Sequence, residues 1–388
     1  MSTNRLYYRD PYLCTFQAKV VDSSNEGRRV YLDSTAFYPS SGGQPHDLGT
    51  LGRQTVVDVI DEEDRIVHVL DGPVSSEVVE GIVDWARRYD HMQQHTGQHL
   101  LSAVFVGLFE AQTLSFHMGA EVSTIELSMK DLTGDQIEQV ERRANEIVWQ
   151  ARPVSICFEE AERASGLRKA SARSGLLRII EIDGLDRSAC GGTHVRSTAE
   201  LGPIQILGWE RIRGNVRTEF VCGGRALRHA KREHQTVTEL SRTTSCAADK
   251  LPENVANLRE RLAELEKQQQ RLTAELARRD GEQIYRNTTP CNDGIRRWLL
   301  EVRSIDEEVR ARSQAFTKPG KAVVLATAME PAGVLIACSA DSGLNAGSIL
   351  KQALARVGGR GGGSAILAQG AMPEPSVAEY LKRELGFL

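Results

Sequence analysis

The sequence predicts an α+β protein of several domains. Its 388 residues exceed the usual size of one domain. Short strand-like runs fill the N-terminal part, and the spacing of apolar residues then changes to that of helices. We expect a small β-barrel-like domain over residues 1–86 and an α+β domain over 87–224. A helical linker over 225–288 and a small glycine-rich α/β domain over 289–388 complete the expected order.

Composition excludes several classes of protein. Hydrophobic residues make up 40% of the chain and charged residues 26%, so a chain disordered throughout is excluded. The formal charge of −4 excludes a polybasic field over the whole molecule, and any nucleic acid must bind local basic patches. The N-terminus lacks the pattern of a secretory signal, and no apolar run is long enough to span a bilayer. Seven scattered cysteines without a CxxC pair favour a reducing cytoplasm.

The N-terminal block is expected to form a barrel or a sandwich. Many short strands at regular spacing are typical of both architectures. The strand-like runs are residues 15–21, 29–35, 54–60, 65–70 and 78–83, and turn residues such as glycine, serine, asparagine and proline separate them.

The second block mixes helices with strands. Apolar residues at helical spacing predict a helix over 88–111 and a second over 135–151. Thr133 or Asp135 is a candidate N-cap of the second helix, and Pro153 lies just past its end. Strand-like runs are found at 122–127, 177–182, 204–209 and 217–221.

The third block is polar and helical from about 224 to 285. Its second half carries an apolar heptad stripe, with Gln269 at one core position. The stripe consists of Val255, Leu258, Leu262, Leu265, Leu272 and Leu276. A helical hairpin with a turn at 249–252, a short dimer arm, or a helix packed on a neighbouring domain would each bury it, and the hairpin is slightly favoured.

The last block alternates strands and helices, as small α/β domains do. Strands are predicted at 322–328, 333–338 and 365–368, and helices at 346–357 and 376–385. A glycine-rich run occupies 358–363.

Two short motifs predict a metal site. His95 and His99 are four residues apart on a predicted helix, so both imidazoles project from one face. Cys190 and His194 have the same spacing on a segment that two glycines allow to turn tightly. Three imidazoles and one thiolate suit one Zn²⁺ ion per chain.

Other kinds of zinc site fit less well. The HExxH glutamate of zinc proteases is missing. The two pairs lie about 90 residues apart, far beyond the spacing in a zinc finger. Four protein ligands would indicate a structural site and three a catalytic one, and the sequence leaves this open. His91 is expected to be a surface residue, whereas His117 lies in an apolar stretch and is a candidate to line a pocket.

The motifs HTGQH and CGGTH resemble the editing domain that alanyl-tRNA synthetase shares with the free-standing alanyl-tRNA editing proteins. The likeness extends to a glycine-rich segment at 32–49, to the arginine-containing segment 211–220, and to the glycine run and Ala368-Gln369-Gly370 near the C-terminus. Ser41 stands where the family often has a glycine. The C-terminal block resembles the last domain of the synthetase and of DHH-type phosphoesterases, and the order of blocks resembles the long form of the editing proteins.

The resemblance implies a trans-editing hydrolase without aminoacylation activity. Its substrate would be tRNA(Ala) mischarged with serine, and also with glycine, and the reaction would cleave the ester to the terminal ribose. Size alone cannot make an alanine pocket reject these amino acids strongly, since such discrimination is worth about 1–3 kcal/mol. A second, hydrolytic site would supply the missing selectivity.

Several residues receive expected roles. Thr96 is the favoured reader of the serine hydroxyl, Gln98 is a weaker candidate, and His117 would position the ester or a water molecule. No general base is assigned, although Asp183 and Asp186 lie upstream of Cys190. The expected RNA contacts are Gly42, Gly43, Gln44, Arg211, Arg213 and Arg217.

Two other functions remain open at this point. A zinc hydrolase of small amino-acid esters would show no dependence on tRNA. A tRNA-binding protein with a purely structural zinc would bind without turnover. A homodimer through the helical linker or the C-terminal domain is also open.

Overall fold

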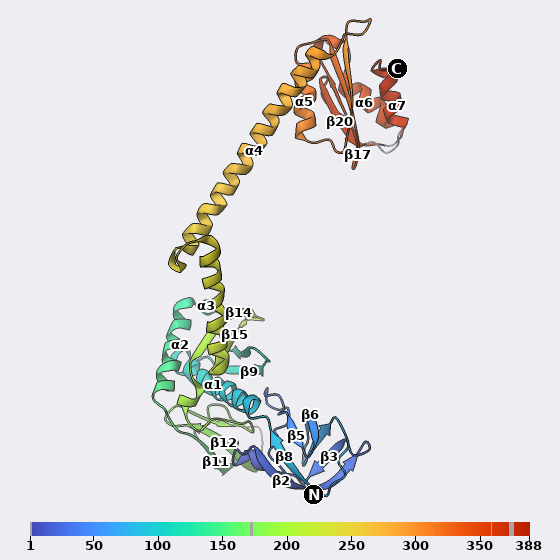
Figure 1. The fold of residues 1–388 in the computed structure, drawn as a ribbon. Helices are drawn as coiled ribbons and strands as arrows, with labels where there is room; N and C mark the ends of the chain where they lie inside the picture. Colours follow the sequence, from blue (N-terminus) through green and yellow to red (C-terminus); the bar gives the residue numbers. More distant parts are fainter. Residues whose placement is uncertain (1, 171–173, 358, 372–375) are drawn as a thin grey trace. The chain divides into compact units, whose positions relative to one another are not determined.

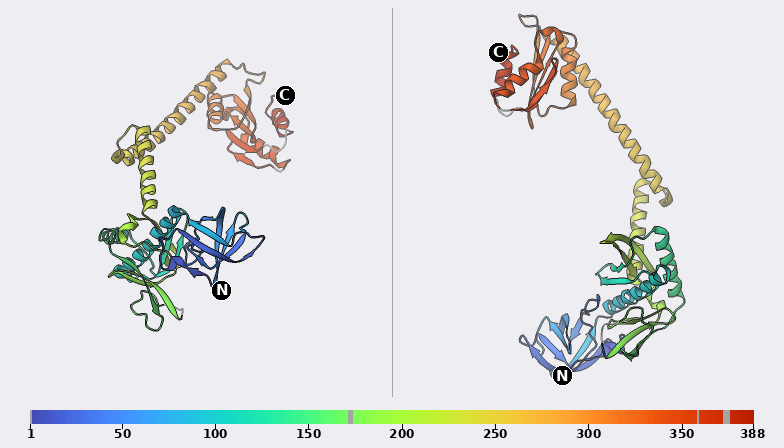
Figure 2. Two further views of the ribbon diagram at one scale, coloured as in Figure 1. Left: turned by 60° about the horizontal axis from the view of Figure 1, so that its bottom comes forward. Right: turned by 180° about the vertical axis from the view of Figure 1, so that it is seen from behind.

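The computed structural model describes residues 2–170, 174–357, 359–371 and 376–388. The chain divides into two compact units, residues 1–239 and 240–388. Figures 1 and 2 show the elements of each unit. The mixed α+β composition and the division into more than one unit confirm the coarse expectation of an α+β protein of more than one domain. Within the described residues, no helix combines the length and apolar character that crossing a membrane requires.

The N-terminal strands form a closed barrel in the order β2-β3-β7-β6-β5-β8. Side chains alternate between the barrel core and solvent, as in β8, because successive residues of a strand point to opposite faces. Phe16, Phe37 and Val56 belong to the core. The strands are β2 (Thr15–Ser24), β3 (Arg29–Leu32), β5 (Gly49–Leu51), β6 (Gln54–Glu62), β7 (Arg65–Leu70) and β8 (Val78–Val83). Two further short strands, β1 (Asn4–Arg5) and β4 (Ser34–Thr35), pair with each other in parallel and form a separate sheet.

Helix α1 (Trp85–Phe109) begins directly after the barrel. The Asp84 side chain caps it by accepting a hydrogen bond from the backbone N–H of Arg87. Residues 91–105 of the helix are buried throughout, unlike those of an amphipathic surface helix. At Gly97 an added Cβ would lie 2.2 Å from the Cys222 sulfur, so glycine is needed for the close approach of α1 to β15 (Asn215–Cys222). The metal motif therefore lies in the interior of the unit.

Two sheets and a second helix surround α1. One sheet has the order β14-β15-β10-β9, and the other β11-β12-β13. Helix α2 (Gly134–Trp149) begins with a capping box between Thr133 and Gln136, so Thr133 is the N-cap. The strands are β9 (Thr113–Met118), β10 (Ser123–Leu127), β11 (Val154–Glu160), β12 (Leu176–Ile182), β13 (Asp186–Ala189), β14 (Ile204–Ile212) and β15 (Asn215–Cys222). The sequence analysis did not identify β9, β11 or β13.

Two long helices follow, α3 (Gly224–Thr244) and α4 (Leu251–Asn287), with a short 3₁₀ turn over Ala248–Lys250. The heptad side chains Leu258, Leu262 and Leu265 on α4 are 50–62% exposed. The C-terminal end of α4 packs on α5 (Glu307–Thr317), where Ala277 and Gly281 are buried. Within the part of the chain that the structure describes, the heptad stripe is therefore uncovered.

The C-terminal sheet has the order β16-β17-β18-β20-β19, with only its first pair parallel. Val323 and Leu325 of β17 belong to the core with α6 and α7, while Val324 and Ala326 face α5 and the end of α4. The remaining elements are β16 (Arg296–Val302), β17 (Ala322–Met329), β18 (Ala332–Cys338), α6 (Ala346–Ala355), β19 (Gly361–Gly363), β20 (Leu367–Ala371) and α7 (Ser376–Glu384). Neither β16 nor α5 was predicted from the sequence, and the last predicted strand begins two residues before β20 does. Gly358 of the glycine-rich run lies outside the described residues.

Candidate metal centre

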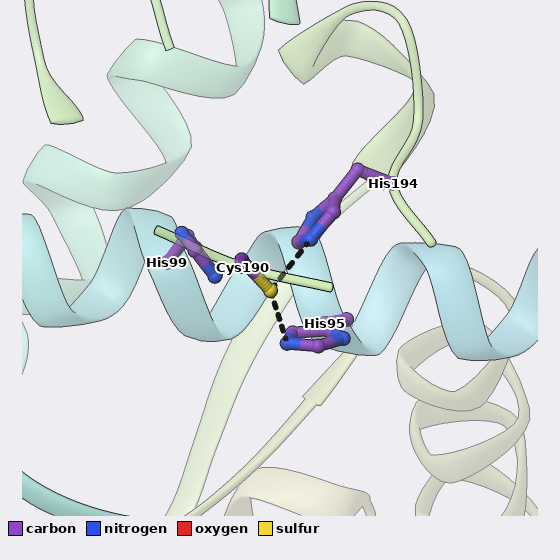
Figure 3. A group of neighbouring side chains, drawn as sticks. All are labelled: His95, His99, Cys190 and His194. Atoms are coloured by element: carbon purple, nitrogen blue, oxygen red, sulfur yellow. Dashed lines mark hydrogen bonds between the residues drawn. The ribbon is translucent and has the colours of Figure 1, made fainter. Parts of the chain in front are cut away.

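The structure brings the four predicted ligands together. His95 and His99 project from α1, while Cys190 and His194 come from the segment after β13 (Figure 3). One ligand atom from each residue lies within 4.8 Å of the corresponding atoms of the other three. The three histidines are almost fully buried, and Cys190 is partly buried. A single metal ion can therefore be held by three imidazole nitrogens and one sulfur.

Each histidine has a partner for its Nδ1 atom. His95 Nδ1 lies 2.8 Å from Gln44 Oε1, His99 Nδ1 lies 3.0 Å from Asp186 Oδ2, and His194 Nδ1 lies 3.1 Å from Thr96 Oγ1. In this arrangement Nδ1 carries the proton and donates it to the oxygen, so Nε2 is left as the ligand atom. The Nε2 atoms of His95 and His194 lie 3.5 and 3.4 Å from the Cys190 sulfur. The hydrogen bonds of the three Nδ1 atoms thus orient the imidazole rings so that their Nε2 atoms can bind one cation.

Electrostatics favour the ligand form of Cys190. Burial opposes ionisation of the thiol, but the imidazoles of His95 and His194 outweigh it and hold the pKa of Cys190 well below its usual value. Burial likewise lowers the pKa of His99, yet its hydrogen bond to Asp186 raises that pKa to about 9. Burial lowers the pKa of His194 to about 3. These shifts favour a thiolate at Cys190 and a neutral imidazole at His194, the forms that bind a metal, and metal binding would release the proton of His99.

Asp186 anchors the His99 side of the centre. Its carboxylate is completely buried, accepts from His99 and also accepts from Arg168 Nε at 2.6 Å. Ser188 donates to the same carboxylate at 3.0 Å. Of the two aspartates upstream of Cys190, Asp186 therefore contacts a ligand, whereas Asp183 is exposed. The only sequence signal for this role is the position of Asp186 four residues before the cysteine.

Gln44 connects the glycine-rich segment to both metal motifs. Besides its contact with His95, Gln44 donates through Nε2 to Thr193 Oγ1 at 2.9 Å and accepts from the Thr193 backbone N–H at 3.2 Å. At Gly43, whose φ is +84°, the loop passes so close to the Phe116 carbonyl that a Cβ would clash with it. Glycine therefore allows the loop to bring Gln44 to this place. Gln44 is buried, so its observed contacts differ from the RNA contact expected of it. Gly42 is exposed and borders the cavity described below.

The two residues predicted to be catalytic lie in different surroundings. Thr96 is fully buried, and its hydroxyl oxygen accepts from His194 and from the Val195 backbone N–H at 3.2 Å. These contacts orient His194. His117 on β9 is exposed, while its neighbour Phe116, on the opposite face of the strand, packs on His95. The structure therefore does not bring His117 to the metal ligands. Gln98 is buried and donates to Ser102.

The arginines expected to contact RNA lie on the hairpin of β14 and β15. Arg211 is 68% exposed and pairs with Asp131, and Arg217 pairs with Glu210 at 3.6 Å. Arg213 is exposed in the turn between the strands.

The expectation that His91 lies at the surface was wrong. His91 is buried because α1 is covered on all sides at this point, and its Nδ1 atom has no partner among the described residues.

A cavity of about 560 Å³ lies beside the ligands. His95, Cys190 and Gly192 form its metal side, and Tyr7, Tyr38 and Arg178 are among its other lining residues. Its volume is within the range of pockets that bind small ligands. A cavity role for these residues was not predicted, because Tyr7, Tyr38 and Arg178 are far apart in sequence and meet only in the folded chain.

Comparisons with known proteins agree on one relationship. Residues 177–217 match the Threonyl and Alanyl tRNA synthetase second additional domain, and residues 310–385 match the DHHA1 domain. The chain is 33% identical to the alanyl-tRNA editing protein AlaX-L of Pyrococcus horikoshii, with 95% of each chain covered. It is 31% identical to the alanine–tRNA ligase of Pyrococcus abyssi over 97% of this chain and 43% of the ligase.

Other matches have similar coverage. The alanine–tRNA ligase of Methanoregula boonei is 32% identical over 96% of this chain and 42% of the ligase. The chain thus spans about two fifths of the length of these curated ligases. Among solved structures, the C-Ala domain of Aquifex aeolicus alanyl-tRNA synthetase is matched at 23% identity with a TM-score of 0.21, over 24% of this chain and 88% of that one.

Proposed function

The chain belongs to the family of the alanyl-tRNA editing protein AlaX-L, and on this premise we propose that it is a hydrolase that deacylates mischarged tRNA(Ala). The proposed substrates are tRNA(Ala) esterified with serine and with glycine, in the cytoplasm, and the chain itself would not aminoacylate. The observation that carries this proposal is the cavity of about 560 Å³ next to a buried His₃Cys cluster. A buried reactive centre with an adjoining pocket suits hydrolysis of one end of a large substrate.

The proposed metal is Zn²⁺. The donor set of three imidazoles and one thiolate fits it, and the Nδ1 contacts hold all three rings in the tautomer that such an ion requires. When bound, Zn²⁺ supplies a fixed positive charge able to polarise an ester or a nearby water. The residues of the chain then have separate tasks. Gln44, Asp186 and Thr96 orient the ligands, and the cavity walls exclude bulk water from the ester.

The four protein ligands favour a second candidate, a tRNA-binding protein in which zinc is structural. Structural zinc sites are commonly closed by four protein ligands, whereas catalytic sites keep one position open. A deacylation assay separates the two candidates. Purified protein of measured metal content would be incubated with Ser-, Gly- and Ala-tRNA(Ala), beside the Cys190→Ala variant. Release of serine or glycine with sparing of alanine supports the enzyme. Binding without release supports the second candidate.

We further propose the four-part division at residues 86, 224 and 288 as the functional one. The editing part would carry the chemistry, and Arg211, Arg213 and Arg217 would contact the tRNA backbone, with Gly42 and Gly43 shaping the approach to the cavity. Release of the ion pairs of Arg211 and Arg217 would accompany RNA binding. That binding should weaken with added salt.

A second copy of the chain is the proposed partner of the heptad stripe on α4. Six apolar side chains follow a heptad pattern of three- and four-residue steps, with Gln269 at the position between Leu265 and Leu272, and they are 48–64% exposed. Two identical stripes complement one another, as a two-fold interface requires. Replacement of Leu262 and Leu265 by glutamate should convert a dimer to a monomer in light scattering. A monomeric wild type would refute this assignment.

A further inference from the structure

Two buried polar atoms beside the cavity have no partner among the described residues. They are Nη2 of Arg178, on β12, and the hydroxyl of Tyr7, near the N-terminus. Both residues line the cavity that also contains His95 and Cys190. Buried donors of this kind are rare in native proteins, because an unmade hydrogen bond carries the full cost of desolvation. Such atoms therefore indicate a ligand or an interior water.

The rest of the Arg178 side chain is held firmly. Nε donates to the Tyr8 carbonyl at 2.9 Å, and Nη1 donates to the Cys190 carbonyl at 2.7 Å. The backbone carbonyl of Arg178 accepts from the Cys190 N–H at 3.0 Å. Arg178 thus holds the peptide of a metal ligand from both sides. Of its guanidinium nitrogens, only Nη2 has no hydrogen-bond partner among the residues that the structure describes.

Among the described residues, Arg178 forms no ion pair with a carboxylate, and its negative neighbour is the Cys190 sulfur when that is ionised. Its hydrogen bonds go to two carbonyls, and the guanidinium carbon lies 5.4 Å from the centroid of the Tyr8 ring. Burial lowers the pKa of Arg178, which expresses the cost of holding this charge away from water. Burial also raises the pKa of Tyr7, so its hydroxyl stays protonated and can donate. One cationic donor and one neutral donor match an anionic, oxygen-rich group.

We propose that this cavity binds the terminal ribose–phosphate of the RNA strand, with Arg178 Nη2 donating to a phosphate oxygen and Tyr7 donating to the ribose–phosphate oxygens. The identification of the strand as RNA rests on the proposed function. Arg178 is then a positioning residue, because one guanidinium group contacts both the seated strand end and the Cys190 peptide. Substrate binding and the geometry of the metal centre are coupled through it.

The test uses adenosine 5′-monophosphate and adenosine as probes of the full-length protein at known zinc content. Calorimetry gives the two dissociation constants for wild type, Arg178→Met, Arg178→Lys and Tyr7→Phe. Arg143→Met is the matched control, because Arg143 is a partly exposed arginine on α2 that pairs with Glu146 and does not line the cavity. Zinc content and melting temperature are measured for every variant, so that a loss of fold is recognised.

The proposal expects the phosphate to improve binding roughly ten- to a hundredfold, as a charge-assisted hydrogen bond does. Arg178→Met should abolish this preference, Arg178→Lys should retain part of it, and Tyr7→Phe should weaken binding of both probes. If Arg178→Met fails to fold, the Arg178→Lys and Tyr7→Phe results decide. Equal binding of the two probes to wild type, or no binding of either, would overturn the proposal and assign both atoms to interior water.

The deacylation assay distinguishes a failure of this inference from a failure of the proposed function. With Ser-tRNA(Ala), Arg178→Lys should raise KM more than it lowers kcat, because the phosphate contact is present in ground state and transition state alike. A wild type that deacylates but binds both probes equally retains the function and loses the inference. A wild type that shows the Arg178-dependent phosphate preference but never deacylates retains the site and loses the function.

Discussion

Replacement of Asp186 by asparagine probes the support of the metal centre most directly. The change keeps the shape of the side chain but removes the charge that His99 and Arg168 share. Mutation of a residue that hydrogen-bonds to a metal-binding histidine typically weakens metal affinity by about 10–100-fold. That factor corresponds to about 1.4–2.7 kcal/mol. We therefore expect the zinc dissociation constant of Asp186→Asn to rise by this factor.

A competition titration against a chromophoric chelator measures that constant. Asp183→Asn is the matched control, since Asp183 precedes Asp186 by three residues and is exposed. The control should bind zinc as wild type does. Zinc affinity of Asp186→Asn within threefold of wild type, in a protein of unchanged melting temperature, would refute the argument that the carboxylate organises His99.

Three further outcomes are expected. Thr96→Val should weaken zinc binding about two- to tenfold through His194 and leave the ratio of Ser- to Ala-tRNA(Ala) deacylation unchanged, whereas a collapse of that ratio would restore Thr96 as the hydroxyl reader. His68 is buried in the barrel with a pKa lowered to about 4, so the unfolded chain takes up its proton below about pH 6.5 and the folded chain does not. Stability should therefore fall by up to about 3 kcal/mol as the pH drops from 7 to 4, and urea titrations of His68→Asn should show less of this loss; parallel curves would contradict the assignment. Thr133→Ala should cost about 1 kcal/mol in urea unfolding by removing the N-cap of α2, and no change would show that the capping box contributes little.

Local patterns sufficed for much of the fold. The helical spacing of apolar residues located α1 and α2, and the HTGQH and CGGTH motifs identified the ligand residues that the structure brings together. Strands β9 and β11 were missed. Most of their side chains are exposed or only partly buried, so they lack a clear apolar alternation.

Contacts that depend on long-range folding were beyond the sequence analysis. Asp186 contacts His99 across 87 positions of the chain, and Gln44 contacts Thr193 across 149. The local sequence offers only one signal for these contacts, the position of Asp186 four residues before Cys190. Tyr7, in a 3₁₀ turn near the N-terminus, and Arg178, on β12, likewise come to one cavity only in the folded chain. The role expected of Thr96 was inferred from its place inside the HTGQH motif, and that of His117 from its apolar neighbours in sequence. Neither signal contains the burial of Thr96 or the exposure of His117, which depend on the folded chain.

The central claim is that the buried cluster and its cavity form an editing site. The most direct test is the single-turnover deacylation of Ser-tRNA(Ala) and Ala-tRNA(Ala) by zinc-loaded protein, with Cys190→Ala and the exposed-residue variant Asp183→Asn beside it. The account predicts rapid release of serine, sparing of alanine, unchanged activity of Asp183→Asn and no activity in a folded Cys190→Ala variant. Failure of the zinc-loaded wild type to release serine or glycine would contradict it.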